Sequence, residues 1–357
     1  MGTCPRRQHA EGRALHFHLI EPVDTRDPID ALPSEVRKHA HKRAQPAWVD
    51  PMLATLAAKA FSDEAWLYES KLDGVRCLAF CNENRTRLLS RNRQALNGAY
   101  PELVEPLAAQ PMRNYIVDGE VVAFKGGVTS FSQLQRRMQV RDPDEARRRG
   151  VEVFYYIFDL LYLNDYDLRT VPLNYRKELL KSNFRFRDPV RFSDHRRREG
   201  ETFFEKACNK GLEGVIAKRA ESVYVSARSR DWLKFKCSSE QEFVIVGYTD
   251  PKGAREAFGA LLVGYYDGDR LLYAGKVGTG FDTEALARLG RELSALQVER
   301  PMVAGEVKAK GVHWVKPKVV AQVAFTEWTR DGKLRHPRFL GIRRDKKPGQ
   351  VTRERPK

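Results

Sequence analysis

The sequence has few cysteines, and those it has form no recognisable pattern. No two are spaced as C-x-x-C, and only five occur in 357 residues: Cys4, Cys77, Cys81, Cys208 and Cys237. An odd number without such spacing argues against a disulfide framework and against a structural zinc site. We therefore expect reduced thiols in a reducing compartment.

Long apolar runs are also missing. No stretch approaches the roughly 20 apolar residues that cross a bilayer as a helix. The N-terminus has no apolar core of the kind found in signal peptides. These absences argue against a membrane partner and predict a cytoplasmic protein.

Acidic residues are too few to balance the basic ones. The chain has 47 Asp and Glu against 63 Lys and Arg, a formal net charge of +16 at pH 7. Such an excess favours a polyanionic partner, nucleic acid first and an anionic membrane second. The basic residues are spread along the chain, and no amphipathic basic helix stands out as a membrane anchor. We therefore expect nucleic acid, although charge alone is equally compatible with a merely basic protein.

The patterns of apolar and turn residues predict two folded domains, as the length also indicates. Residues 1–47 are basic and lack a sustained period, which predicts a poorly ordered extension. Short strands and helices predict a mixed α+β domain over residues 48–238. Five short strands and one helix over residues 239–350 predict a small, partly open β-barrel of the OB-fold type. Residues 351–357 form a basic tail.

The stretch Lys71-Leu72-Asp73-Gly74-Val75-Arg76 places four chemically useful side chains within six residues. Read alone, it predicts a tight charged turn, because glycine tolerates positive φ. A nucleophilic lysine needs a lowered pKa, through desolvation or nearby cations. The segment Trp232–Lys236 offers both, because strand alternation places Lys234 and Lys236 on one face. A solvated surface strand is the alternative for that segment.

Two further segments place carboxylates at a turn next to an apolar strand. They are Asp118-Gly119-Glu120 and Glu213-Gly214. Such oxygen ligands suit Mg²⁺ or a ribose hydroxyl, although either turn alone is more often structural. Ser90-Arg91-Asn92 adds an arginine at a strand end, and Phe158 is an aromatic that either stacks on a base or fills the core.

Taken in order, these motifs resemble those of the covalent nucleotidyltransferases: ATP-dependent DNA ligases, RNA ligases and mRNA capping enzymes. The series is K-x-D-G-x-R, S-R-N, D-G-E, an aromatic strand ending in F-D, E-G-V-I-A-K and W-L-K-F-K. The resemblance runs from about Pro51 to Lys347 and is strongest to the ligase module of bacterial non-homologous end-joining DNA ligases. Supporting segments are Pro51–Ala54, Tyr273–Phe281 and Phe325–Gly332.

The resemblance implies a nucleotidyltransferase (adenylation) domain followed by an OB-fold domain, and an ATP-dependent DNA ligase that uses Mg²⁺ or Mn²⁺. Lys71 would be the catalytic nucleophile that forms lysyl-AMP. The substrate would be nicked or broken double-stranded DNA in DNA repair, which places the protein on the nucleoid when DNA is bound. A Ku-type end-binding protein is a candidate partner, and the enzyme is expected to act as a monomer.

The resemblance also implies roles for other residues. Phe158 would stack on adenine beside Glu69, and His336–Lys347 resembles the family's last motif. The expected ATP or AMP contacts are Glu69, Arg76, Arg91, Glu120, Phe158, Lys218, Lys234 and Lys236. The expected metal ligands are Glu120 and Glu213. The expected contacts to the leaving group or DNA are Arg338, Arg343 and Lys346.

Other functions remain open at this point. RNA ligation and RNA capping use the same motifs, but the OB-fold segment disfavours both. An NAD-dependent ligase is disfavoured because the chain lacks a zinc-type cysteine set. A catalytically silent DNA-binding scaffold is disfavoured by the intact Lys71, Glu120, Glu213, Lys234 and Lys236. The first 45 residues match neither a polymerase nor a phosphoesterase module, so we expect a standalone ligase without a large N-terminal DNA-binding domain.

Overall fold

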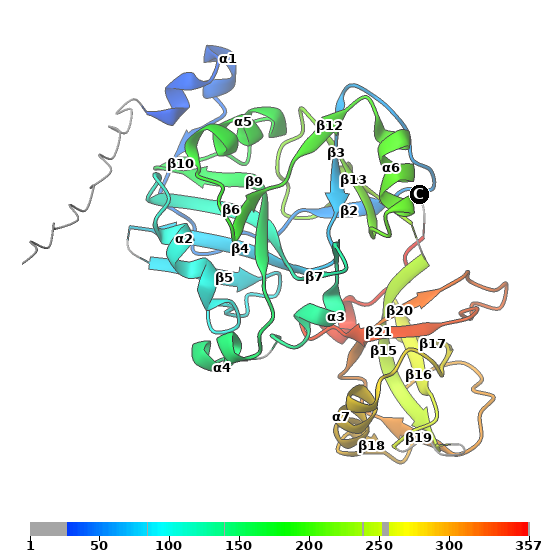
Figure 1. Ribbon diagram of the computed structural model, residues 1–357. Helices are drawn as coiled ribbons and strands as arrows, with labels where there is room; N and C mark the ends of the chain where they lie inside the picture. The colour runs from blue at the N-terminus through cyan, green and yellow to red at the C-terminus, as the bar shows by residue number, and fades with distance from the viewer. Residues whose placement is uncertain (1–26, 84, 139, 238, 252–256, 356–357) are drawn as a thin grey trace, which may run out of the picture.

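The computed structural model describes residues 27–83, 85–138, 140–237, 239–251 and 257–355. They form an upper part built on two sheets and a lower part built on a third (Figure 1). The upper part ends with the strand that finishes at Lys236, and the lower part begins at Ser239. The domain boundary expected near residue 238 falls between these strands. No described helix has the length and apolar character needed to span a bilayer.

The first sheet of the upper part has seven strands centred on a long apolar one. Nine of the ten residues of that central strand, Phe154–Leu163, are buried, because apolar and aromatic residues cover both of its faces. The strands are β1 (His41–Lys42), β4 (Val75–Asn82), β5 (Arg85–Ser90), β6 (Asn114–Val122), β9 (Phe154–Leu163), β10 (Tyr166–Asp167) and β11 (Val190–Phe192). A small separate hairpin joins β7 (Phe124–Lys125) to β8 (Val128–Thr129).

The second sheet carries most of the sequence motifs, and its register brings them together. Its strands, in spatial order, are β12 (His195–Arg197), β3 (Trp66–Lys71), β13 (Gly214–Arg219), β14 (Arg228–Lys236) and β2 (Leu53–Leu56). Gly214 lies between Lys71 and Lys236, and two residues along β13, Ile216 lies between Glu69 and Lys234. Side chains two residues apart on a strand share a face. Three motifs that are far apart in sequence therefore meet at one end of this sheet.

The turn Asp73-Gly74 connects the two upper sheets. Lys71 ends β3 in the second sheet and Val75 begins β4 in the first, so these strands are not hydrogen-bonded partners. A Cβ at Gly74 would lie 2.2 Å from the carbonyl oxygen of Val121. The glycine is therefore required by a close backbone approach.

The third sheet forms the lower part and matches the five strands expected there. They are β15 (Ser239–Thr249), β16 (Leu261–Asp267), β17 (Arg270–Val277), β19 (Val312–Val315) and β20 (Val320–Phe325). Two shorter strands extend the sheet: β18 (Gln297–Val298) pairs with β19, and β21 (Arg338–Ile342) pairs with β20. Strand β15 pairs with β20 through its first half and with β19 through its last residues. The pairing among the described residues does not close the sheet into a complete barrel.

Short helices cover the sheets. They are η1 (Pro28–Ala31), α1 (Ser34–Arg37), η2 (Pro101–Leu103), α2 (Val104–Ala108), α3 (Phe131–Leu134), α4 (Pro143–Arg148), α5 (Leu173–Asn183), α6 (Gly200–Asn209), α7 (Thr283–Ser294) and η3 (Pro348–Gln350). Helix α7 begins where the Asp282 carboxylate accepts a hydrogen bond from the amide of Ala285 at 2.7 Å, which is an ordinary N-cap. Helix α3 has only 4 residues.

Both ends of the chain depart from the sequence expectations. Residues 1–26 lie outside the described part, but Ile29, Leu32 and Val36 are buried in the core of the first sheet. The expectation of a poorly ordered extension is therefore wrong for residues 27–47. At the other end, Val351 is buried in the core of the third sheet, so the basic tail packs against the fold as far as it is described.

Two further expectations are corrected. Residues 118–119 do not break the strand, because β6 runs through them with shifts in register. Cys208 and Cys237 form a disulfide that joins the end of α6 to the residue after β14. The expectation that all thiols are reduced is wrong for this pair, which sequence spacing alone could not bring together.

Candidate active site

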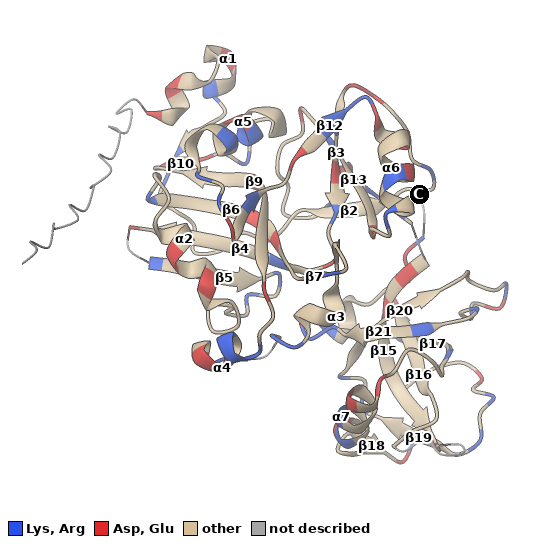
Figure 2. Cartoon of the chain, in the orientation of Figure 1, with Lys and Arg blue, Asp and Glu red and all other residues tan. Residues whose placement is uncertain are grey.

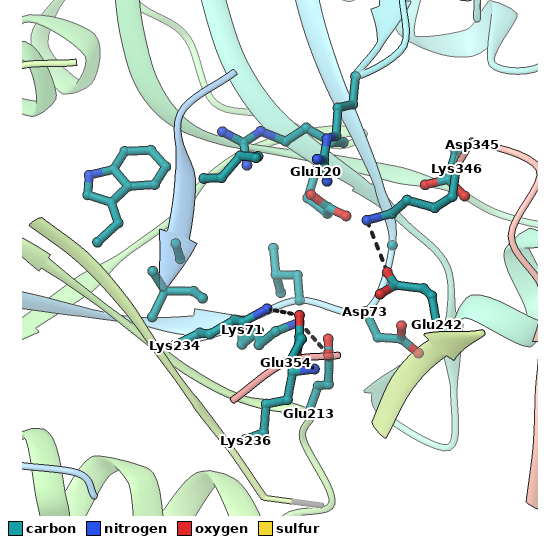
Figure 3. Close-up of a pocket in the computed structure, with 18 of the residues that line it drawn as sticks. Lys71, Asp73, Glu120, Glu213, Lys234, Lys236, Glu242, Asp345, Lys346 and Glu354 are labelled. Atoms are coloured by element: carbon teal, nitrogen blue, oxygen red, sulfur yellow. Dashed lines mark hydrogen bonds and ion pairs between the residues drawn. The ribbon is translucent and has the colours of Figure 1, made fainter. Parts of the chain in front are cut away.

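A cavity lies where the two upper sheets face the lower part (Figure 3). The second sheet contributes the ends of β3, β13 and β14, and the first sheet contributes β4, β6 and β9. The lower part contributes β15 and the chain after β21. The expected site residues that line it are Glu69, Lys71, Arg76, Arg91, Glu120, Phe158, Glu213, Lys218, Lys234, Lys236, Arg343 and Lys346. Arg338 is exposed at the start of β21 and is absent from this lining.

Lys71 points into the cavity from the end of β3 and forms an ion pair with Glu213 (Figure 3). Its side chain is 18% exposed. Burial alone would lower the pKa of this amine, but Glu213, with Asp73 and Glu120, raises it above its usual value. The expectation that nearby lysines lower the pKa of Lys71 is therefore wrong here. Lys234 and Lys236 line the same cavity, but the carboxylate in direct contact with Lys71 outweighs the effect of burial on its pKa.

The carboxylates next to Lys71 have unusual proton affinities. Burial, and then the charge of Glu213, raises the pKa of Asp73 to about 6. Burial raises the pKa of Glu120 to about 7, although Arg76 and Lys71 oppose the change. Burial thus disfavours the negative charge of these carboxylates, which a bound cation would restore. Such a group is suited to an additional cation.

At the inner end of the cavity, Glu69 is held by internal partners. Its carboxylate accepts hydrogen bonds from Lys177 Nζ at 2.7 Å, Lys218 Nζ at 2.9 Å and Ser193 Oγ at 3.1 Å. Burial would raise the pKa of Glu69, but the two lysines lower it below its usual value. The main role of Glu69 in this structure is therefore to neutralise the two buried ammonium groups of Lys177 and Lys218.

Phe158 lies between cations in the same region. Lys218 Nζ lies 4.1 Å from its ring centroid and the Arg76 guanidinium carbon lies 4.6 Å away, which are cation–π distances. Arg76 is oriented by Asp118, whose two oxygens each accept one bond at 2.5 Å. Asp118 also accepts a bond from the Tyr224 hydroxyl at 2.6 Å. These cations lie over the faces of the ring, so a planar base that stacks on Phe158 would have to share or displace one of these contacts.

The lower part closes the cavity with the expected last motif. Lys346 Nζ lies 3.0 Å from Glu242 Oε1 (Figure 3). Arg343 pairs with Asp345 at 2.8 Å, and Asn92 after β5 donates to the backbone carbonyl of Asp345. The two parts of the molecule therefore touch through the same short segment that lines the cavity.

Sequence reasoning missed several residues of the site. They are Asp118, Lys177, Glu242, Asp345 and Glu354. In the sequence, Asp118 stands out only as part of an Asp-Gly turn. Lys177 follows an arginine within α5, where two adjacent basic residues usually predict a solvated helix face. Nothing in the local pattern indicates that this lysine is buried against Glu69.

Comparison with known proteins agrees with this geometry. The family model of the ATP dependent DNA ligase domain matches residues 51–236, and that of the ATP dependent DNA ligase C terminal region matches residues 254–346. The fold and site thus define a covalent nucleotidyltransferase with a C-terminal OB-fold domain. The chain belongs to the ATP-dependent DNA ligase family.

Individual relatives are similar over most of this chain. It is 39% identical over 335 residues to the multifunctional non-homologous end joining protein LigD of Pseudomonas aeruginosa. That alignment covers 91% of this chain and 39% of the LigD protein. It is 32% identical over 317 residues to a probable DNA ligase of Dictyoglomus turgidum, covering 80% of this chain and 54% of that protein. The chain therefore spans less than half of the LigD relative and about half of the other.

A solved structure is similar in both sequence and fold. The mycobacterial DNA ligase D complexed with ATP and MES shares 33% sequence identity with this chain at a TM-score of 0.63. The match covers 86% of this chain and 98% of that one. The described architecture is thus that of a known ligase domain.

Proposed function

We propose that this protein seals 5′-phosphate and 3′-hydroxyl ends in double-stranded DNA with ATP, through a lysyl-AMP intermediate. The observation that carries the proposal is the position of Lys71, which ends β3 inside a cavity lined by basic residues of three motifs. The names of the relatives support non-homologous end joining as the pathway. A Ku-type end-binding protein is then the partner to test, with the ligase acting as a monomer.

The chemistry follows from groups in the cavity. The Lys71 amine, once it has lost its proton, attacks the α-phosphorus of ATP. An N–P bond forms, the bond to the β-phosphate breaks, and pyrophosphate leaves. AMP then passes to the 5′-phosphate of the DNA, and the 3′-hydroxyl attacks that phosphate and releases AMP. Lys234, Lys236, Arg343 and Lys346 are the cations available to neutralise phosphate charge along this path.

The residues around Lys71 fit a divalent cation. Asp73, Glu120 and Glu213 all line the cavity, and burial raises the pKa of the first two. No ready-made group of three metal ligands occurs among the residues that the structure describes. We infer that Glu120 and Glu213 would hold Mg²⁺ or Mn²⁺ together with oxygens of the nucleotide, as Mg²⁺ commonly binds. The ion would neutralise charge on the phosphate oxygens.

Incubation with labelled ATP, GTP or NAD, followed by denaturing electrophoresis, tests the first step. We expect a covalent label from ATP alone. Sealing assays on nicked DNA, cohesive ends, blunt ends and nicked RNA then test the substrate, with and without a Ku-type protein. Labelling by GTP would favour capping, sealing restricted to RNA would favour an RNA ligase, and no label with retained DNA binding would favour a scaffold.

Glu120→Gln is expected to raise Tm at pH 8 by roughly 1–3 °C and to change it little at pH 5. Folding raises the pKa of Glu120 from 4.5 to about 7. The protonated form is thus favoured in the folded state, and the stability it contributes is lost as pH rises through about 7. Glutamine resembles the protonated acid at every pH. Thermal unfolding at both pH values checks this, and an equal loss of Tm at both would indicate a structural role.

DNA binding is expected to be mainly electrostatic and shared by both parts of the molecule, which both carry Lys and Arg (Figure 2). Log affinity should fall linearly with log salt, with a slope of roughly −0.9 per phosphate contact on duplex DNA. Removing residues 337–357 is a poor test, because it deletes β21 and the buried Val351. Arg338→Ala is cleaner, since this residue is exposed and outside the cavity.

If Arg338 contacts a DNA phosphate, its loss should reduce the magnitude of the salt slope by about one contact and leave lysyl-AMP formation unchanged. The measurement is a titration of nicked duplex at several salt concentrations. An unchanged slope would show that Arg338 does not contact a DNA phosphate. Slower lysyl-AMP formation would show that Arg338 acts in the ATP reaction instead.

A further inference from the structure

The segment after η3 carries an acidic side chain into the phosphate end of the cavity. Glu354 Oε1 lies 2.5 Å from Lys234 Nζ, and its Oε2 lies 2.8 Å from Lys236 Nζ (Figure 3). The side chains are 20% exposed for the glutamate and 13% and 11% for the lysines. One carboxylate therefore bridges both lysines in a largely desolvated place. These are the lysines that the proposed function assigns to the phosphates of ATP.

The position of Glu354 is set by the fold of the lower part. The backbone amide of Glu354 donates to Gln241 Oε1 at 3.0 Å, and Gln241 Nε2 donates to the carbonyl of Thr352 at 2.9 Å. Gln241 is itself buried on β15. One residue before Thr352, the buried Val351 accepts a hydrogen bond from the amide of Tyr266 at 2.7 Å. Val351, Thr352 and the Glu354 backbone are thus fastened to the lower part, so the place of the carboxylate is determined by packing.

We propose that Glu354 is a built-in competitor for the phosphate site, occupying Lys234 and Lys236 in place of the outer phosphates of ATP or of pyrophosphate. This inference rests on the proposed function and names a regulation of the same site. A carboxylate brings one negative charge and two acceptor oxygens. A pyrophosphate group brings more of both, so it displaces the carboxylate when its concentration is high enough.

The competition has a consequence for the direction of the reaction. When ATP binds, its phosphates must displace Glu354, which raises the ATP concentration needed. After lysyl-AMP forms and pyrophosphate leaves, Glu354 returns to the lysines and opposes re-entry of pyrophosphate. The reverse attack of pyrophosphate on lysyl-AMP is thereby weakened. Two other charged side chains lie near the Glu354 carboxylate and its two lysines. Lys71 acts electrostatically on Lys234, and Glu242 on β15 acts on Glu354.

A simpler role for the same contact makes the opposite prediction. If Glu354 only fastens the lower part to the upper sheets, its removal should loosen the cavity. ATP and pyrophosphate would then bind more weakly to the variant. The competitor role requires both to bind more tightly.

Glu354→Gln tests the proposal, because it keeps the shape of the side chain and removes its charge. We expect the apparent KM for ATP in lysyl-AMP formation to fall roughly three- to tenfold, the scale by which a hydrogen bond to a charged group exceeds one to a neutral group. The pyrophosphate concentration that half-discharges isolated lysyl-AMP enzyme should fall by a similar factor. Unchanged or higher values of both ATP and pyrophosphate constants would overturn the proposal.

Two controls separate charge from shape. Glu306→Gln alters an exposed carboxylate of the lower part that pairs with Lys308, outside the cavity, and should match the unmodified protein. Glu354→Asp keeps the charge on a shorter arm and should stay closer to the unmodified protein than Glu354→Gln. If the aspartate and glutamine variants behave alike, charge is not the cause and the proposal fails.

A binding measurement keeps the inference separate from the proposed activity. Pyrophosphate is titrated calorimetrically into the full chain carrying Lys71→Ala, with and without Glu354→Gln. Neither protein needs to react. Tighter binding by the double variant supports competition even if lysyl-AMP were never formed with ATP, and equal or weaker binding overturns it. A failure of ATP labelling in the unmodified chain would instead count against the ligase proposal.

Discussion

Lys71→Ala is expected to abolish covalent labelling by ATP, the largest single effect we predict. Lys71 ends β3 inside the cavity and is the lysine in contact with Glu213. Without its amine no N–P bond can form, so ordinary nicks should not be sealed. A nick that already carries AMP should still be sealed to a measurable extent, because only the first step needs the nucleophile. Denaturing electrophoresis after incubation with labelled ATP measures the first outcome, and a sealing assay measures the second.

The control for this variant is Lys308→Ala, which removes an exposed lysine of the lower part. It should label and seal as the unmodified protein does. Persistent labelling of the Lys71→Ala protein at Lys234 or Lys236 would show that the nucleophile is misassigned. Equal loss of sealing on ordinary and pre-adenylylated nicks, with a lowered Tm, would point to misfolding.

Glu213→Gln is expected to slow lysyl-AMP formation on the order of a hundredfold or more, the scale of losing a group that acts on the reacting atoms. The Tm should change by no more than a few degrees, because changes outside the core usually cost little. Glu213 touches the nucleophile directly and lies with the carboxylates suited to a metal ion. A time course of labelling at saturating ATP and Mg²⁺ measures the rate.

The pH dependence of this variant distinguishes a chemical role from a structural one. Glu213 is the main partner that raises the pKa of Lys71, so its loss should lower that pKa. The neutral amine then becomes available at lower pH, and the residual rate should reach half its maximum at a lower pH than in the unmodified protein. A matched surface change, Glu199→Gln, removes an exposed partner of Arg196 and should leave the profile unmoved. An unshifted profile with a large loss of Tm would make Glu213 structural.

Much of the candidate site could be predicted because its motifs are short and local. Each motif combines a chemical group with a strand end or turn, and such features follow from a few neighbouring residues. The five short strands expected over residues 239–350 correspond to β15, β16, β17, β19 and β20. All the expected nucleotide contacts line one cavity. Their individual roles in binding ATP remain predictions.

The failures have a common physical origin in long-range contacts. The N-terminal residues Ile29, Leu32 and Val36 stand in a segment without a sustained period, yet they are buried because distant strands cover them. Cys208 and Cys237 come together because α6 and β14 end at neighbouring places. The pKa of Lys71 rises because β13 brings in Glu213. None of these partners lies close in sequence to the residue it affects.

The sequence by itself determined the class of chemistry, which is covalent nucleotidyl transfer. The features that indicate it are the basic charge, a lysine at a glycine turn, and carboxylates and paired lysines at strand ends. These depend on residue type and local pattern. Only the tertiary structure decided which charges neutralise one another. It brought Glu213 into an ion pair with Lys71, Lys177 into an ion pair with Glu69, and Glu354 into ion pairs with Lys234 and Lys236. The reason is that Coulomb energy and desolvation depend on distance and burial in space, and sheet register and the docking of the lower part set both.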